Sequence, residues 1–494
     1  MSAVEVYSAP EGGSGRRERE ERRSRRFETR IAVCAGGGEV CDGWVLGVVG
    51  AALPLARDDL ELTPLWVGLI GSASLIGLFF GGLVFGWLTD KVGRQKMYLI
   101  DLLVFLVGSL LQLLVQDPAQ LFAVRLVMGA AVGADYAIAG ALVAEFATPA
   151  RRGRLLASLI VFWYVGYTLA TGFGIAMASL TDSASAWRWI LASSALPSLL
   201  VLLVRLGTPE SPSWLVSKGR LAEAEAISRR WLGRGLERPA PDGVPVRTRH
   251  ATLFSPFYLR RTLFTSLFWL CQVTPFFAIS TFAPQVLSQL GAPGNGLGEL
   301  LLNVFLLLGC VTGVVVINRV GRRALLIWPF CVTAAALLVL GLWPQANQGV
   351  IALCFGVFAL FHAGSSVLQA VYPSEVFPTE IRATGIGFAA AVSRIGAAFG
   401  TFLVPLGLQA WGVGAVMLLG CAVSAAGAVV SAAWAPETGG LELAEASRPQ
   451  PSGRIPVPDP RPLPESRTFD DQETHVPASV HLGVSDRRSP RQDR

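Results

Sequence analysis

Three carboxyl side chains lie within long apolar stretches of the sequence. Glu39 and Asp42 are about one helical turn apart in the first stretch, and Asp135 lies near the middle of the fourth. A charge inside a membrane costs on the order of 3 kcal/mol or more and is usually functional. A carboxyl group in a low-dielectric cavity also takes up a proton more readily than one in water. These residues predict proton binding and release, with Glu39 the nearest to an opening of the cavity.

Arg125, in the same stretch as Asp135, leaves an alternative open. Asp42 or Asp135 would then form a structural ion pair with its guanidinium group and take no part in proton transfer. Arg125, Gly129 and Gly133 recur every four residues, so one stripe of this helix is nearly bare backbone and permits close packing. We expect Arg125 to be a structural partner of one aspartate rather than a ligand of a substrate.

Arg394 lies in the eleventh apolar stretch and has no acidic residue within one helical turn. A buried guanidinium group without a partner is costly, so we expect an anion to meet it. A substrate carboxylate or the side chain of Glu375 is the candidate partner.

Ring side chains on other stretches predict the body of a binding cavity, which an apolar or aromatic ring would fit. The alternative is that these rings face lipid or only fill space, and His362 in particular is either a titrating group or a packing residue. Pro275 is expected to break the seventh helix and expose backbone groups to the cavity. The candidates for the cavity are Tyr136, Trp163, Tyr164, Tyr167, Trp269, Gln272, Phe276, Phe277, Phe361 and His362.

Charged residues at the ends of the apolar stretches occur in two related sets. GWLTDKVGRQK at 86–96 returns as NRVGRR at 318–323, AEFATPARRG at 144–153 as SEVFPTEIRATG at 374–385, and PESP at 209–212 as PETG at 436–439. Each copy is displaced by roughly 230 residues, which indicates a duplicated unit.

Partly dehydrated ion pairs among these charges are worth about 1–3 kcal/mol and can hold one face of a membrane protein closed. The alternative is that they only anchor the helix ends. Gly93 and Gly321 suit tight turns with positive φ, and Asn318 replaces the acid expected in the second copy, which predicts a weaker second half of the gate. The predicted gate residues are Asp90, Gly93, Arg94, Glu145, Arg152, Glu375 and Arg382.

The composition restricts the class of protein. Of 494 residues, 52% are hydrophobic and 15% charged, which is typical of a polytopic membrane protein. The net charge of +6 comes from loops and chain ends, so it does not indicate nucleic-acid binding. The cysteines fall in apolar stretches without a CxxC or His-Cys cluster, which predicts neither disulfides nor a metal site. No nucleophile-base pair, phosphate loop or cofactor motif indicates an enzyme.

Twelve stretches are long enough to cross a bilayer. They lie at 31–56, 64–88, 97–116, 119–147, 155–180, 187–206, 262–290, 297–318, 323–344, 349–373, 383–409 and 411–434. Basic residues concentrate in alternate loops, so the positive-inside rule puts both termini in the cytoplasm of a cell, as an inner or plasma membrane protein.

The predicted organisation has five parts. Residues 1–30 form a disordered cytoplasmic arm that is not a signal peptide. The segment 31–206 is an N-terminal six-helix half, 207–261 a central cytoplasmic loop with helical spacing at 221–232, and 262–435 a C-terminal six-helix half. The tail at 436–494 is rich in Pro, Arg and Asp and should be mostly disordered.

Several of these motifs together resemble the metabolite:proton symporters of the major facilitator superfamily. They are GxLxDxxGRxK, RxxxGxxxG, the two ExxxxxxR segments and PESPSWL, and they span about 31–440. The resemblance implies an all-α membrane protein of twelve transmembrane helices in two six-helix halves. GADY at 133–136 and EVCDGWVLG at 39–47 also resemble segments of phosphate symporters and related carriers, which implies a role in proton transfer for Asp135 and Asp42.

The resemblance also bears on the class of substrate. The stretch 269–287 aligns with the sugar-porter pattern QQxxGxNxxxYYAP at Gln272 and at Ala283-Pro284. However, Pro275 and Phe277 replace the Gly and the Asn that a polyol would need, which argues against a hexose. Val273 and Phe277 stand where phosphate symporters have an Asp and a Tyr, which argues against inorganic phosphate.

The sequence therefore predicts a monomeric, proton-coupled importer of a small organic metabolite in the lipid bilayer, working by alternating access without a cofactor. A carboxylate with an aromatic or apolar body is the expected substrate. A proton antiporter that exports drugs or metabolites is the first alternative, and a transporter-like sensor is the second.

Overall fold

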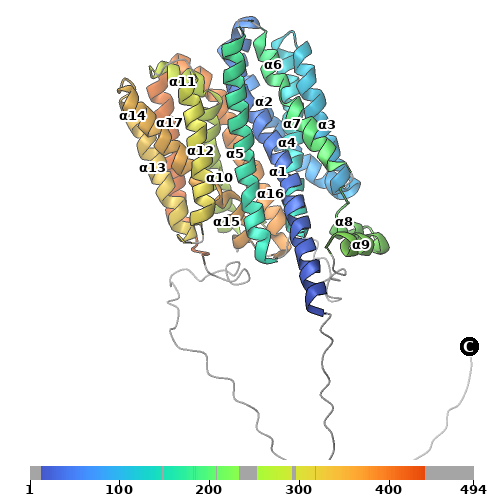
Figure 1. The fold of residues 1–494 in the computed structure, drawn as a ribbon. Helices are drawn as coiled ribbons and strands as arrows, with labels where there is room; N and C mark the ends of the chain where they lie inside the picture. Colours follow the sequence, from blue (N-terminus) through green and yellow to red (C-terminus); the bar gives the residue numbers. More distant parts are fainter. Residues whose placement is uncertain are drawn as a thin grey trace, which may run out of the picture. The chain divides into compact units, whose positions relative to one another are not determined.

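A computed structural model of the chain describes an almost entirely helical protein (Figure 1). It describes residues 13–146, 149–181, 183, 185–206, 208–232, 253–256, 258–291, 296–317, 319–377 and 379–439, with some side chains left out inside these ranges. Twelve helical spans are long and apolar enough to cross a membrane. The twelve spans predicted from the sequence are thereby confirmed, because an apolar run of about 20 residues has few other stable fates.

The N-terminal half contains α1 to α7, in which the sixth span is made of two short helices. Their bounds are α1 Gly13–Asp59, α2 Pro64–Val92, α3 Arg94–Leu111, α4 Pro118–Phe146, α5 Pro149–Leu180, α6 Ala186–Ala192 and α7 Ala195–Arg205, with a 3-10 turn at Gln112–Leu114. The central loop carries α8 Pro212–Ser217, α9 Leu221–Ile227 and a π-helical turn at Ser228–Leu232. The helical spacing predicted at 221–232 is therefore confirmed.

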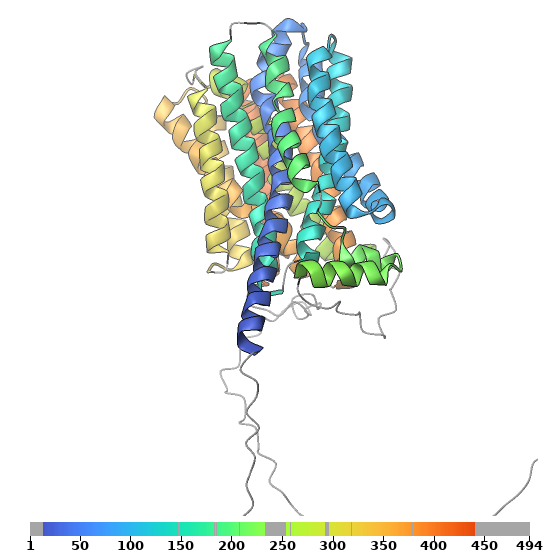
Figure 2. The same ribbon diagram turned by 45° about the vertical axis from the view of Figure 1, so that its right-hand side comes forward.

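The C-terminal half contains α10 to α17. Their bounds are α10 Leu259–Thr281, α11 Ala283–Gln289, α12 Leu297–Val316, α13 Arg322–Leu342, α14 Gln348–Ser366, α15 Leu368–Val376, α16 Thr379–Ala410 and α17 Gly412–Trp434. We call the side of the bundle where α1 begins and α17 ends the terminal side, and the opposite side the far side. Helices α8 and α9 lie on the terminal side (Figures 1 and 2).

Two expectations about helix limits differ from the structure. Helix α1 begins at Gly13, so residues 13–30 continue the first helix instead of forming a disordered arm, and α1 extends beyond the bundle in Figure 2. Arginines and glutamates alternate along this segment, and both are good helix formers. The tail from residue 440 onward lies outside the described residues.

The second difference concerns the seventh span. Pro275 lies inside the continuous helix α10, so the prediction that it breaks this helix is wrong. The break falls at Phe282, with φ −112° and ψ 23°, directly before Ala283 and Pro284. Neighbouring helices can compensate one missing N–H inside a membrane helix, whereas a proline in the first turn of α11 needs no partner.

Glycines bring three pairs of helices into backbone contact. A Cβ atom added at Gly43 or Gly166 would meet the backbone of the facing helix in the α1–α5 pair. The same holds for Gly129 against Ser74 in the α2–α4 pair and for Gly309 against Leu360 in the α12–α14 pair. The α10–α16 pair is different, because Gly396 and Gly400 face the side chain of Thr274. Each half is therefore built on helix pairs that side chains hardly separate.

The two halves meet closely on the far side. A Cβ atom at Gly68 in α2 would lie 2.6 Å from the carbonyl oxygen of Phe402 in α16. One at Gly71 would lie 2.8 Å from the ring of Phe282. Small residues thus let α2 pack directly against the C-terminal half near the far side.

Candidate functional site

Asp42 and Asp135 lie side by side in the interior of the N-terminal half. Asp42 on α1 is 0% exposed and Asp135 on α4 is 1% exposed, and the two carboxyl groups are within electrostatic range of each other. Both oxygens of each side chain lack a hydrogen-bond partner among the described residues. Gly38 makes room for this arrangement, because a Cβ atom there would collide with the Asp135 carboxylate and the Tyr98 hydroxyl. Two unpaired acids at this depth are the kind of group that exchanges protons.

Glu39 connects these acids to the other half of the molecule. It is 7% exposed and lies within electrostatic range of Arg394 on α16 and Arg205 on α7. Arg394 is 2% exposed, and its Nε has no hydrogen-bond partner among the described residues. Its guanidinium carbon lies 5.0 Å from the ring centroid of Tyr136 and 5.9 Å from that of Phe277. Arg394 is thus held mainly by ring faces from both halves, which leaves donor capacity for an anion.

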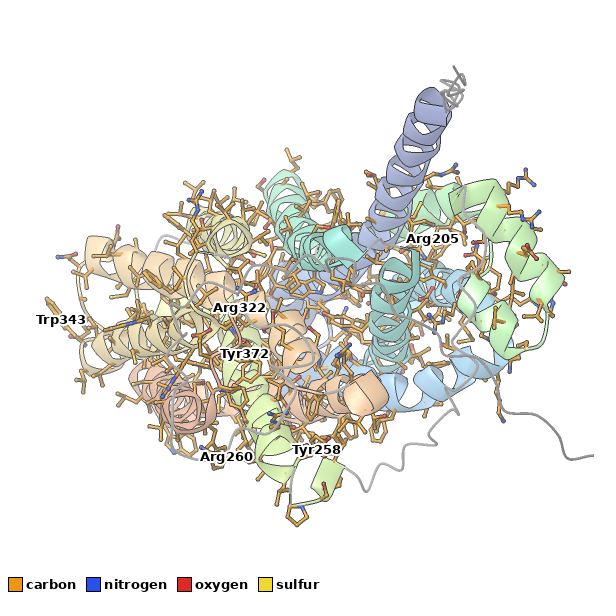
Figure 3. The ribbon with its side chains drawn as sticks, turned by 90° about the horizontal axis from the view of Figure 1, so that it is seen from below. Arg205, Tyr258, Arg260, Arg322, Trp343 and Tyr372 are labelled. Atoms are coloured by element: carbon orange, nitrogen blue, oxygen red, sulfur yellow. The ribbon has the colours of Figure 1, made fainter. Side chains whose placement is uncertain are left out.

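Glu375, one of the two partners expected for Arg394, is engaged elsewhere. The Thr438 hydroxyl donates to it over 2.6 Å, and Arg322 pairs with it at 3.4 Å. In the view from below, Arg322 lies beside Tyr372 (Figure 3), whose hydroxyl donates to the Pro436 carbonyl over 2.7 Å. Glu375 therefore belongs to the terminal side of the C-terminal half.

A cluster of rings spans the contact between the halves. Trp163 stacks on Tyr167 with 5.2 Å between ring centroids and meets Phe276 at 6.0 Å and Phe277 at 6.2 Å. His362 on α14 stacks on Phe276 at 5.1 Å. The cluster unites α5, α10 and α14, and its role as the lining of a binding cavity stays a prediction.

Phe361 and Trp269 are two further aromatic residues predicted for the cavity. Phe361 is 37% exposed on the outside of the bundle, so its placement in the cavity is wrong. Trp269 is 6% exposed, and within the described part of the chain its indole N–H, like that of Trp163, has no hydrogen-bond partner. Buried indole donors without partners are available to a bound acceptor.

Gln272 forms a buried polar network on α10. Its Nε2 donates to the Ser365 hydroxyl over 2.7 Å, and its Oε1 accepts from Gln369 over 3.1 Å. Trp269, Gln272 and Phe276 share one helical face, so this network lies beside the ring cluster. The amide of Gln272 is held in a fixed orientation by these partners.

Arg125 has partners other than the expected aspartates. It donates to the Val45 carbonyl over 3.0 Å and reaches Gln112 at 3.5 Å, and it is 1% exposed. Its contacts are therefore with backbone and an amide, not with Asp42 or Asp135. Gly129 and Gly133 on the same helix lie against the backbone of α2.

The predicted gate is only partly described. Arg382 donates from Nε to the Phe377 carbonyl over 3.1 Å, and Gly93 has φ 109°, as expected for its turn. Gly321 has φ −57° instead, so the positive φ predicted there is wrong. The side chains of Asp90, Glu145 and Arg152, and residue Asn318, lie outside the described residues. The unequal strength of the two gates stays a prediction.

The repeated PES and PET segments have a clear structural role. Glu210 accepts from the backbone N–H groups of Arg94 and Gln95, both over 3.1 Å, at the start of α3. Glu437 accepts in the same way from Arg322 over 2.9 Å and Arg323 over 3.2 Å at the start of α13. A carboxylate at a helix N-terminus satisfies orphan donors and matches the helix dipole.

Close approach of these carboxylates explains the two glycines before the helices. A Cβ atom at Gly93 would lie 2.6 Å from Glu210, and one at Gly321 would lie 2.5 Å from Glu437. Gly321 is therefore required by space and not by its φ.

Sequence reasoning missed three buried charges. Asp101 on α3 is 2% exposed; one of its oxygens accepts from the Leu102 N–H over 2.6 Å, and the other has no partner in the part of the chain that the structure describes. Arg205 is 2% exposed, donates to the Cys34 carbonyl and lies over the Tyr98 ring. Figure 3 places it in the N-terminal half, away from Arg322. Glu299 on α12 is 5% exposed. Asp101 is a charge within an apolar stretch, which was the available signal, whereas Arg205 and Glu299 lie near the ends of their stretches.

The fold and these buried groups define a class, namely a polytopic transporter of the major facilitator type. The structure of the major facilitator proton:xylose symporter XylE of Escherichia coli matches with a TM-score of 0.70 at 20% identity, over 86% of this chain and 99% of that one. The sequence profile described as "Sugar (and other) transporter" matches residues 31–449. The chain belongs to that family.

Two relatives carry names that bear on metabolites. The chain is 40% identical over 422 residues to the inner membrane metabolite transport protein YgcS of Escherichia coli (strain K12), covering 85% of this chain and 94% of the relative. It is 28% identical over 380 residues to a protein of Bacillus subtilis (strain 168) provisionally named niacin/nicotinamide transporter NiaP, covering 76% and 88% respectively. The protein is thus a multi-pass membrane transporter of the metabolite-carrying kind, and not an enzyme.

Proposed function

We propose that this transporter imports a small organic carboxylate with an aromatic or apolar body, coupled to protons, by alternating access. The observation that carries the proposal is Arg394, a buried guanidinium group between rings of the two halves with an unpartnered Nε. A guanidinium group can grip a carboxylate with two parallel hydrogen bonds, while the rings accept the body of the molecule.

The unpartnered groups around the ring cluster support an acceptor-rich substrate. Arg394 Nε and the indole N–H groups of Trp163 and Trp269 are all buried donors. Gln272, in contrast, has both ends of its amide engaged by protein. A sugar hydroxyl can also accept from these donors, but it brings an O–H that needs an acceptor of its own, whereas a carboxylate presents acceptors alone.

Glu39 offers a route by which protons affect this substrate. It is an acid within electrostatic range of Arg394, so an ionised Glu39 competes with a substrate carboxylate for the guanidinium group. Protonation of Glu39 removes the competitor and favours substrate binding. Asp42 and Asp135 extend the set of proton-binding groups into the N-terminal half, and the name of the proton:xylose symporter XylE supports coupling of this kind.

Two other functions remain as alternatives. A proton antiporter would use the same residues with export as the outcome, and outward flux from everted vesicles would favour it. A sensor would bind its ligand without concentrative transport. The provisional niacin/nicotinamide assignment of NiaP favours a carrier of a ring-bearing metabolite over the sensor.

The proposal includes a placement in the cell. The terminal side faces the cytoplasm of an inner or plasma membrane, since basic residues concentrate in the loops of that side. The working unit is a monomer whose halves, 31–206 and 262–435, rock about the ring cluster. The loop 207–261 lies in the cytoplasm together with the residues before 31 and after 435.

The test of substrate class is thermal stabilisation of the purified protein by nicotinate, benzoate, nicotinamide and xylose. The two carboxylates should stabilise it, and the amide and the sugar should not. Arg394→Lys keeps the charge but loses the two parallel N–H donors of the guanidinium group, and should weaken carboxylate binding by about 1–3 kcal/mol, or about 5- to 150-fold. Unchanged carboxylate affinity in well-folded Arg394→Ala would refute the role of this residue.

The test of coupling uses Asp42→Asn and Asp135→Asn in reconstituted vesicles. Each should abolish uphill accumulation driven by a pH gradient, while exchange of substrate across the membrane continues. Normal accumulation by both variants, at normal protein levels, would refute their role in proton transfer.

A further inference from the structure

Glu299 is a buried acid on the far side that the proposed transport mechanism does not use. It lies in the first turn of α12 and is 5% exposed. Its Oε1 would lie 3.3 Å from a Cβ atom at Gly50 on α1. The side chain of Glu299 therefore crosses from the C-terminal half to the N-terminal half.

Two backbone carbonyl oxygens face the same point. The same Cβ position at Gly50 would lie 3.3 Å from the carbonyl oxygen of Thr281 and 3.6 Å from that of Ser280. These residues end α10. The Ser280 carbonyl accepts from the Phe282 N–H, and Pro284, four residues after Ser280, has no N–H to offer it. A carboxyl oxygen and two carbonyl oxygens, all acceptors, thus converge at a bare stretch of α1.

Opposing fields act on the carboxyl group of Glu299. The N-terminal turn of α12 favours its ionised form, because the positive end of a helix dipole attracts an anion. The carbonyl end of α10 favours its protonated form, because the negative end repels an anion and accepts a hydrogen bond from an acid. A carboxyl group between two such helix ends is placed to change its protonation state.

The described charges near Glu299 offer it no cation. Tyr167 on α5 is the titratable group within electrostatic range of it. Helices α11, α12 and α14 contain no other Asp, Glu, Lys or Arg, and the arginines of α10 lie at its opposite end. On α1 the nearest charges beyond Gly50 are Arg57, Asp58 and Asp59, about two helical turns away. No described ion pair competes with a proton for this site.

We propose that Glu299 is a proton-binding site of the far-side gate, separate from the acids near Arg394. In its protonated form the carboxyl group donates a hydrogen bond to the carbonyl end of α10, and the contact of α1 with α10 and α12 closes. When Glu299 loses the proton, its carboxylate repels those carbonyl oxygens and the halves part on the far side. The inference rests on the proposed proton coupling, to which it adds the step that links protons to the gate.

The experiment measures closure directly, without substrate and without a gradient. A Cβ atom at Gly172 on α5 would lie 3.8 Å from Leu300 Cδ1 on α12, so Gly172→Cys with Leu300→Cys reports far-side contact through cross-linking by a short bis-maleimide. Each single-cysteine variant controls for native thiols, of which Cys331 is exposed. The rate is followed in purified full-length protein across a range of pH.

Maleimide reacts with the thiolate, which becomes more abundant as the pH rises, so the cross-linking rate is divided by the maleimide labelling rate of the single-cysteine variants at the same pH. With Glu299 intact, this ratio should fall as the pH rises, by up to about tenfold per pH unit, which is the limit for one linked proton. Glu299→Gln keeps a donor and cannot ionise, so its ratio should be high and independent of pH. Asp59→Asn is the matched control, because this far-side acid already pairs with Arg188 at 2.7 Å. Its pH profile should equal that of the protein with Glu299 intact.

Infrared spectroscopy of the same samples gives the second measurement. A protonated carboxyl C=O band present below the cross-linking midpoint should be missing in Glu299→Gln. An unchanged pH profile in Glu299→Gln, or no lost band, would overturn the proposal. Closure that responds to added Na⁺ and not to pH would overturn it in favour of a sodium site. Because this experiment measures no transport, a failure of proton-coupled import would not change its result. A failure of the proposal for Glu299 would likewise not count against proton-coupled import.

Discussion

The carboxylates that cap α3 and α13 allow a quantitative prediction. Glu210 is partly buried and accepts from the first two N–H groups of α3 and from the Ser211 N–H over 2.9 Å. Removal of a helix cap costs about 0.5–2 kcal/mol, and hydrogen bonds to a charged group are worth about 1.5–3 kcal/mol. Water replaces part of this in Glu210→Ala, so we expect a loss of about 1–2 kcal/mol.

At about 2–4 °C per kcal/mol for a unit the size of one half, the unfolding midpoint should fall by about 2–8 °C. The assay is thermal unfolding in detergent followed by tryptophan fluorescence. Glu437 is exposed, so solvent screens its charge and Glu437→Ala should cost less than Glu210→Ala. Glu223, in an exposed pair with Arg220, is the control and should cost almost nothing. A Glu210→Ala midpoint equal to that of Glu223→Ala would refute the capping role.

Three further changes test the packing around the site. Gly129→Ala puts a methyl group into the Ser74 backbone and should sharply reduce folded protein in the membrane, whereas Gly140→Ala on the same helix meets nothing within 4 Å and should be neutral; equal yields would contradict this. Arg125→Met leaves the Val45 carbonyl without its donor and should lower stability by about 1–3 kcal/mol while the pH dependence of transport persists; a changed pH dependence would reinstate it as a partner of Asp42. Gln272→Leu removes the side-chain amide that bonds both Ser365 and Gln369, and it should lower the unfolding midpoint more than Gln369→Leu does.

The membrane spans could be predicted because an apolar segment of about 20 residues has the length and composition of a membrane-spanning helix. The interior of the seventh span could not. A single run at 262–290 contains two helices; the break was predicted at Pro275, whereas it falls at Phe282. The missing N–H at Pro275 is tolerated because neighbouring helices pack around it. The sequence of the seventh span alone does not show which helices pack there.

The candidate site, too, could be predicted only in part. Residue type and depth were enough to single out Asp42, Asp135 and Arg394 as buried charges. They were not enough to identify partners, because the identity of the facing residue depends on which helices pack together. Arg125 illustrates this, since Val45 and not an aspartate faces it.

Glu299 was missed for a related reason. As the third residue of its helix it resembles a boundary charge that reaches water. Its burial is imposed by α1, whose glycine lets the carboxyl group approach. Position within a run therefore predicts the burial of a charge only when the neighbouring helix is known.

The glycine contacts within the α1–α5, α2–α4 and α12–α14 pairs have a genetic consequence. At these positions an added carbon atom meets main-chain atoms, which no substitution on the facing helix can remove. A damaging replacement there should resist rescue by a second change in the opposing residue. Suppressors should map instead to loops or helix ends, where they allow a whole helix to shift. At Gly400 the nearest neighbour is the side chain of Thr274, so a smaller residue at 274 should restore function locally, whereas a Cβ atom at Gly396 would also meet the side chain of Leu270 and would need a smaller residue there as well.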